Sequence, residues 1–213
     1  MKNILVLIFC FLVLKAGGQD NQVEFNGKTW IAPYSLSKPQ GWDVERFTIP
    51  ISFAPTISYK GIEDIRFTPG WGKATTTEYW SYAFLWYLDG LPEMNEKTIE
   101  ENLKAYYTGL VGGNIESRKI TAEKLVPITT SVKKAKASKN DLATYTGTIK
   151  MLDYMAQLPI TMNCIIHFRP DKEKNKTFVF YEISPRPYSD DVWKSLDKLW
   201  SEFDINKQES KSN

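Results

Sequence analysis

The sequence predicts a single α+β domain, an antiparallel sheet of about six to eight strands with two amphipathic helices packed on one face. Several segments alternate apolar and polar residues with a period of two, which is typical of strands that cover a core. The gaps between these segments are short, which favours antiparallel hairpins over parallel crossovers. Helical periodicity is confined to two segments, and the composition of 42% hydrophobic and 24% charged residues is that of an ordinary globular protein.

The first 18 residues are predicted to be a cleaved signal peptide rather than part of the fold. A lysine near the start precedes an apolar run over residues 4–14, and Ala16 and Gly18 are small residues spaced as signal peptidase requires. The run is about half of the roughly 20 apolar residues that a membrane-spanning helix needs. We therefore expect an exported protein, periplasmic or secreted, that starts at Gln19 and has no transmembrane segment after cleavage.

Removal of this segment changes the charge and the cysteine content. The whole chain has 27 basic and 25 acidic residues, and the segment carries two of the lysines, so the remaining protein is formally neutral. The segment also carries Cys10, which leaves Cys164 alone and excludes an intramolecular disulfide. We expect one domain over residues 19–205, followed by a disordered polar tail at 206–213.

The N-terminal part of the domain is predicted to be extended. Asn26-Gly27 lies between two β-prone runs within residues 23–34 and indicates a two-residue hairpin. Residues 43–71 contain three prolines, which exclude a long helix and favour edge strands and extended loops.

The most aromatic segment, residues 78–88, is predicted to be a strand. Tyrosine, tryptophan and phenylalanine favour strands, and Asp89-Gly90 ends the run as a turn. A buried helix is the alternative, because Thr75 and Glu78 have the spacing of a capping box.

Two helices are predicted from apolar residues that recur every three or four positions. The first covers residues 98–110, where Thr98 and Glu101 form a capping box and a Gly-Gly pair follows the last turn. The second covers residues 189–203, where Ser189 is the expected N-cap and acidic residues occupy the first turn.

Three or four strand-like segments lie between these helices. They cover residues 119–132, 142–155, 158–169 and 177–183. The basic run at 133–139 lacks interleaved aromatic residues and belongs to a neutral protein, so we expect a solvated hairpin loop and no nucleic-acid partner.

Motifs for catalysis or metal binding are absent from the sequence. It contains no glycine-rich nucleotide loop, no nucleophile elbow, no zinc-protease motif and no EF-hand loop. The one histidine, His167, is three residues from Cys164, so the two side chains point to opposite faces of a strand and form no nucleophile pair. The sequence therefore favours a non-catalytic protein, without a cofactor or a metal.

Aromatic residues are the better lead to a binding site. They make up 14% of the chain, and several lie between residues 71 and 87 near charged side chains. Rings with a few polar groups bind sugars and other flat ligands, although rings on alternate faces of a central strand can equally form the core. The predicted ligand-binding residues are Arg66, Trp71, Glu78, Trp80 and His167.

Three functions are compatible with these features. The first is a non-catalytic binding or accessory protein whose aromatic-lined site takes a small molecule, a glycan or an envelope protein. The second is a hydrolase acting on an envelope or extracellular polymer, which needs two of Glu63, Glu78 and Asp89 within about 10 Å across a cleft. The third is a structural subunit of an envelope complex, which predicts a large exposed apolar patch.

The central segment also carries a family resemblance. Residues 48–71, TIPISFAPTISYKGIEDIRFTPGW, are followed at 78–90 by EYWSYAFLWYLDG. This pair resembles a family of uncharacterised exported bacterial proteins, and the glutamine at the expected cleavage point is similar to that of Bacteroidetes-type signal sequences. The resemblance implies an exported bacterial protein and carries over no catalytic residue.

Overall fold

The computed structural model describes residues 25–209, which form a seven-stranded antiparallel sheet and two α-helices. The predicted signal peptide, the cleavage point at Gln19 and residues 210–213 lie outside the described residues. The predicted α+β class and the number of strands are confirmed. Within residues 25–209 neither helix combines the length and the apolar character needed to span a membrane.

The sheet and the helices account for most of the predicted segments. The strands are β1 (Asp43–Ile49), β2 (Gly61–Phe67), β3 (Tyr82–Asp89), β4 (Thr129–Ala135), β5 (Ala143–Asp153), β6 (Leu158–Asp171) and β7 (Lys176–Ser184). The helices are α1 (Glu96–Ile115) and α2 (Asp191–Ser201), with a short 3-10 helix at Ala122–Lys124. The aromatic run is therefore a strand, as predicted, and its ladder begins at Tyr82.

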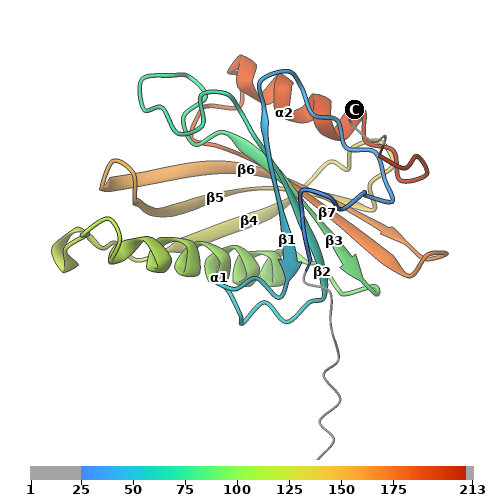
Figure 1. The fold of residues 1–213 in the computed structure, drawn as a ribbon, viewed down its shortest axis with the longest axis horizontal. Coiled ribbons are helices and arrows are strands. Elements are labelled where there is room, and N and C mark those ends of the chain that lie inside the picture. Colours follow the sequence, from blue (N-terminus) through green and yellow to red (C-terminus); the bar gives the residue numbers. More distant parts are fainter. Residues whose placement is uncertain (1–24, 210–213) are drawn as a thin grey trace, which may run out of the picture.

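The sheet consists of two antiparallel meanders that join at its centre. The strand order is β1-β2-β3-β7-β6-β5-β4, so β3, the last strand of the first meander, pairs with β7, the last strand of the second. Helix α1 connects β3 to the far edge strand β4 and packs on β4 and β5, while α2 packs on β7. Figure 1 shows α1 along one side of the twisted sheet and α2 along the other.

The two helices lie on opposite faces, which corrects the prediction that both pack on one face. Tyr82, Phe84 and Trp86 of β3 point into a core that includes α1, whereas Ala83 and Leu85 point into a second core that includes α2. Because β3 is apolar on both faces, each face needs its own cover to exclude water. The unbroken apolar run of this strand is the sequence signal for a sheet covered on both sides.

Helix α1 is longer at both ends than predicted. Its N-cap is Asn95, whose Oδ1 accepts a hydrogen bond from the Thr98 backbone N–H at 3.0 Å, so Thr98 lies inside the helix. The glycines at 112–113 do not end the helix, because they lie on its exposed side and the backbone bonding continues to Ile115.

Three other local predictions differ from the structure. The hairpin predicted at Asn26 is wrong, because the first strand of the described residues begins at Asp43. Residues 133–135 of the basic run belong to β4, so the solvated loop is shorter than expected. Helix α2 has Asp190 as its N-cap in place of Ser189.

Candidate functional site

An aromatic pocket of about 450 Å³ opens on the α1 face of the sheet, beside the edge strand β1. Strand β1 contributes Asp43, Glu45 and Phe47, which alternate along the strand and so share one face. Helix α1 contributes Tyr106 and Leu110, which lie one turn apart. Eight aromatic side chains line the pocket: Phe47, Phe53, Phe67, Trp71, Trp80, Tyr82, Tyr106 and Tyr154.

A close contact between the helix and a loop holds one wall of the pocket. Gly109 of α1 lies so near Phe53 that a Cβ at this position would be 1.8 Å from the Phe53 carbonyl oxygen. Only glycine therefore allows the connection between β1 and β2 to lie against the helix. The ring of Phe53 then packs edge-on against Tyr106, with 5.1 Å between the ring centroids.

The loop between β2 and β3 supplies the opposite wall, and Glu78 holds this loop in place. The Gly70 backbone N–H donates to Glu78 Oε2 at 2.7 Å, and the Thr76 hydroxyl donates to the Gly70 carbonyl at 3.0 Å. A Cβ on Gly70 would approach Glu78 Oε2 to 2.7 Å, so the turn needs a glycine here. Glu78 thus positions Trp71 and does not line the pocket itself.

Two indole groups of the pocket wall have lost water without gaining an acceptor. Within residues 25–209, Nε1 of Trp71 and Nε1 of Trp80 are buried and make no hydrogen bond. The Trp80 indole lies near enough to the Tyr79 hydroxyl to influence its pKa, yet the two groups do not reach hydrogen-bond geometry. Buried donors without partners are rare in native proteins, and each asks for an explanation such as a ligand or a bound water.

Trp80 is also strained. Its φ of 55° places a bulky residue in the left-handed region, which costs on the order of 1–3 kcal/mol. This conformation sets the Trp80 ring 5.9 Å from Trp71 and 5.1 Å from Tyr154, measured between ring centroids. Strain of this kind concentrates at functional sites, which is consistent with a binding role for the pocket.

A buried carboxyl group lies behind the pocket. Glu63 of β2 is fully buried, accepts a hydrogen bond from the Tyr106 hydroxyl at 2.7 Å and accepts another from Trp86 Nε1 at 2.9 Å. Burial raises the pKa of Glu63 to about 8 in spite of these bonds. The group therefore carries a proton at neutral pH and adds little charge to the pocket.

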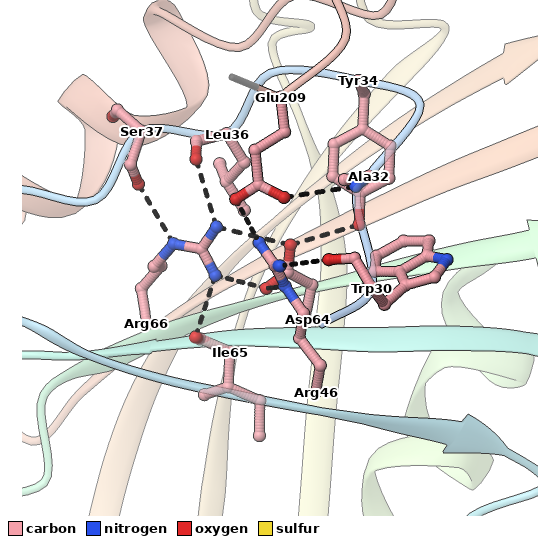
Figure 2. A network of polar contacts seen from close by, with 10 residues as sticks. All are labelled: Trp30, Ala32, Tyr34, Leu36, Ser37, Arg46, Asp64, Ile65, Arg66 and Glu209. Carbon is pink, nitrogen blue, oxygen red and sulfur yellow. Dashed lines mark hydrogen bonds and ion pairs between the residues drawn. The ribbon is translucent and has the colours of Figure 1, made fainter. Parts of the chain in front are cut away.

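Arg66, a predicted ligand-binding residue, lies on the opposite face of the sheet in a closed polar network (Figure 2). Its guanidinium group bonds to Asp64 and donates to the carbonyl oxygens of Leu36 and Ser37 at 3.1 Å. Arg46 bonds to the same carboxylate at 2.9 Å. The arginine is buried and fully engaged, so its role is to connect the N-terminal segment to the sheet.

The C-terminal segment completes this network. Glu209 accepts a hydrogen bond from Arg46 Nη2 at 2.7 Å and another from the Ala32 backbone N–H at 3.2 Å, as Figure 2 shows. With Glu209 in place, two guanidinium groups face two carboxylates, and the charges balance. Glu209 belongs to the predicted tail at 206–213, so the part of that tail within the described residues makes defined contacts.

His167, a second predicted ligand-binding residue, is also part of a buried cluster on the α2 face. Its Nδ1 lies 2.7 Å from Asp141 Oδ2, and its Nε2 lies 3.1 Å from Glu182 Oε1. Burial opposes the charged form, but the two carboxyl groups outweigh it and raise the pKa of His167. Arg169 and Trp200 donate to Asp141 at 3.0 Å, which closes the cluster against substrate.

The carboxylates considered for hydrolysis do not form an acid–base pair. Glu63 is buried in the core on the α1 face, and Glu78 accepts the Gly70 N–H in a loop. Asp89 ends β3 at its far end and pairs with Lys176. These three groups do not face one another across the pocket.

The structure thus brings together two of the five predicted site residues. Trp71 and Trp80 line the pocket, Glu78 supports its loop, and Arg66 and His167 lie on the other face. Sequence reasoning missed the contribution of β1, although the alternation of Asp43, Glu45 and Phe47 marks a strand face that carries both charge and an aromatic ring.

Metal ligands and reactive thiols do not mark a further site. Within residues 25–209 there is no group of three or more histidine, cysteine or acidic side chains placed to hold a metal ion. Cys164 is a free, buried thiol, and burial raises its pKa to about 12, so it is not a nucleophile at neutral pH.

Comparison with known proteins gives no further guide to this site. No family model, no curated protein and no solved structure matches the chain.

Proposed function

We propose that this chain is an exported, non-catalytic binding protein that takes a small organic ligand into the aromatic pocket on the α1 face. The carrying observation is the pocket itself, about 450 Å³ in volume and lined by eight aromatic side chains. Cavities of this size, with apolar walls and a few polar groups, are the usual form of a small-molecule site.

The two unpartnered indole groups support a ligand with a polar atom. Trp71 and Trp80 each offer one N–H donor, and neither donor has an acceptor within residues 25–209. Neither donor is exposed to the pocket, so a ligand hydroxyl or carbonyl oxygen would reach one only if the indole turned toward the cavity; the gain would then be large because the donor is already desolvated. This argues for a ligand with a flat apolar body and an oxygen acceptor.

The hydrolase alternative has less support. The carboxylates that could act as acid and base are separated by the sheet or engaged in loop contacts, so none of the expected pairs faces the pocket. The alternative of a structural subunit stays a prediction, since the exposed large apolar residues of the described chain lie on separate elements. They are Leu91, Leu125, Leu142, Leu158 and Tyr188.

A fluorescence screen tests the proposal directly. Purified protein is titrated with small aromatic alcohols, phenols and monosaccharides while tryptophan emission is recorded. Trp71→Phe keeps a ring in the wall but removes the indole N–H, so we expect it to weaken binding of the oxygen-bearing ligands by about tenfold. Trp30→Phe, on the opposite face, is the matched control and should bind as the wild type does.

Two results would overturn the proposal. The first is an absence of saturable binding across the screen. The second is binding that Trp71→Phe and Trp30→Phe weaken equally, because the responsible site would then lie outside the pocket.

Export is part of the same proposal and has its own test. The apolar run and small residues at the N-terminus, together with the resemblance to exported bacterial proteins, support cleavage before Gln19. Expression of the full chain in a Gram-negative host, followed by fractionation and N-terminal sequencing, should yield a periplasmic or secreted form that begins at Gln19. Recovery of the uncleaved chain from the cytoplasm would contradict it.

A further inference from the structure

The charge at the rim of the aromatic pocket is negative. Asp43 and Glu45 project from alternate positions of β1, and the charged residues that line the pocket are these two. Both side chains are exposed, and neither forms an ion pair or a side-chain hydrogen bond with any residue between 25 and 209. The rim therefore holds two carboxylates that the described protein does not compensate.

The charge of Glu45 extends into the pocket. Burial is the main cause of the raised pKa of Tyr154, about 12; the positive charge of Arg118 opposes it, and the negative charges of Asp153 and Glu45 add to it. Glu45 likewise adds to the effect of burial at Glu63, behind the pocket. The charge of Glu45 thus reaches one group in the pocket wall and one behind it.

Basic residues lie near the pocket but do not line it. Arg118 lies over the ring of Tyr154, with its guanidinium carbon 4.9 Å from the ring centroid, and does not line the pocket. Lys28 and Lys38 line a second groove along the edge of β1, which shares Glu45 and Phe47 with the pocket, and within residues 25–209 neither lysine forms an ion pair with Glu45. Arg46 lines that groove too, but it is paired with Asp64 and Glu209.

We propose that this pocket selects an organic cation, namely an ammonium group attached to an aromatic body that also bears an oxygen acceptor. The proposal rests on the proposed function and narrows its ligand class. Aromatic faces attract cations through the ring quadrupole, and the carboxylates of Asp43 and Glu45 attract them at the rim. The aromatic body fills the apolar interior, and its acceptor pairs with an indole N–H that turns toward it.

Three matched probes test the charge preference. Tyramine, tyrosol and 4-hydroxyphenylacetate share a phenol ring but carry a cation, a neutral hydroxyl and an anion. Isothermal titration calorimetry at low salt should give the tightest binding for tyramine, about tenfold weaker binding for tyrosol and the weakest for the anion. The advantage of tyramine should shrink as salt is raised, because the rim carboxylates are exposed to solvent.

Charge-neutralising variants assign the preference to the rim. The double variant Asp43→Asn/Glu45→Gln should lose most of the preference for tyramine over tyrosol while leaving the affinity for tyrosol unchanged. The control Glu173→Gln/Glu202→Gln removes the same two charges from exposed positions that do not line the pocket, and it should keep the tyramine preference. Both variants change exposed side chains, so the fold is preserved.

The outcomes separate this inference from the function on which it rests. Equal binding of all three probes, or a tyramine preference undiminished in Asp43→Asn/Glu45→Gln, overturns the selectivity proposed for the rim but leaves a functional pocket. Tighter binding of the anion overturns it as well. Failure of all three probes to bind, with wild type and variants alike, overturns both the inference and this assignment of the pocket.

Discussion

On the α2 face of the sheet, buried charged groups bond to one another, whereas on the α1 face two indole N–H groups and the hydroxyl of Tyr181 have no partner among the described residues. Arg46, Asp64 and Arg66 form one closed group around a shared carboxylate, and His167 is held between two acids in another. On the α1 face the single polar atom of Trp71 and that of Trp80 lack an acceptor within the described chain.

The difference shows why buried charged residues are a poor guide to the site in this protein. The α2 face also has unpartnered atoms, Arg169 Nε and Glu182 Oε2, but each belongs to a side chain that makes other bonds. Hydrogen bonds among such buried side chains stabilise the fold and make these side chains unavailable to a ligand. The α1 face combines a cavity with donors that have no other use.

The contrast between the two faces predicts the largest loss of stability at His167. Replacing His167 by glutamine should lower the free energy of unfolding by about 3–5 kcal/mol, because two buried acids lose their shared partner. Urea denaturation at pH 6 measures the loss. Asp191→Asn removes the exposed pair with Lys194 and should change little, so equal effects of the two variants would contradict the assigned role.

The same cluster predicts a pH dependence. The pKa of His167 in the folded protein lies above its ordinary value of 6.5, so folding favours proton binding. The stabilisation is fully present below about pH 6.5 and is lost as the pH rises through the raised folded value. The difference in stability between wild type and His167→Gln should therefore narrow on going from pH 6 to higher pH.

Glu63 offers the next largest effect and lies on the α1 face. Its pKa is raised from 4.5 to about 8, so the folded protein keeps a proton that the unfolded chain releases between these values. Stability from this group is present below pH 4.5 and falls as the pH rises to about 8. Glu63→Gln imitates the protonated form and should reduce the loss of stability between pH 5 and 8 by about 2–4 kcal/mol.

Thermal or urea unfolding across this pH range checks the Glu63 prediction. Glu101→Gln changes an exposed glutamate on α1 and should keep the pH dependence of the wild type. An unchanged slope in Glu63→Gln would mean that Glu63 is ionised in the folded protein.

A smaller loss is expected at the C-terminal contact. Glu209→Gln should cost about 1–2 kcal/mol of unfolding free energy, because Arg46 loses a charged partner but keeps Asp64. Urea denaturation of this variant is compared with Glu202→Gln, whose carboxylate makes an exposed pair. If the two variants are equally stable, the contact of Glu209 does not hold the C-terminal segment in solution.

The smallest effect on stability is expected at Trp71. Because its indole N–H has no partner, Trp71→Phe should change the free energy of unfolding by less than about 1 kcal/mol while weakening ligand binding. Denaturation and calorimetry on the same sample separate the two effects. A large loss of stability would place Trp71 with the structural residues and would remove the contrast between the two faces.

The fold was largely predictable because it follows from local patterns. Period-2 alternation located β5, β6 and β7 within a few residues, and aromatic content identified β3. The face of the sheet on which each helix packs was not predictable, because β3 has two apolar faces and the sequence does not indicate which helix covers which face.

The site was only partly predictable, for a reason that differs among residues. Trp71 and Trp80 were expected because rings cluster around β3, and both line the pocket, whereas Arg66 and His167 lie away from it and bond to groups in other segments of the chain. Arg66 bonds to carbonyls about 30 positions away, and His167 bonds to Asp141 in the loop before the neighbouring strand β5. Pairing of this kind is set by tertiary packing, which no local pattern reports.

The pairing of β3 with β7 has a consequence for how the pocket comes into being. Each meander closes over short loops, but this ladder joins Tyr82 to Ile183 and must pay the entropy of a long closure. The pocket draws Trp80 from the first meander and Tyr154 from the second, so it is complete only after the two halves dock. A bound ligand would contact both halves and hold them together. By mass action it would raise the unfolding temperature, and its contacts would also slow the separation of the halves.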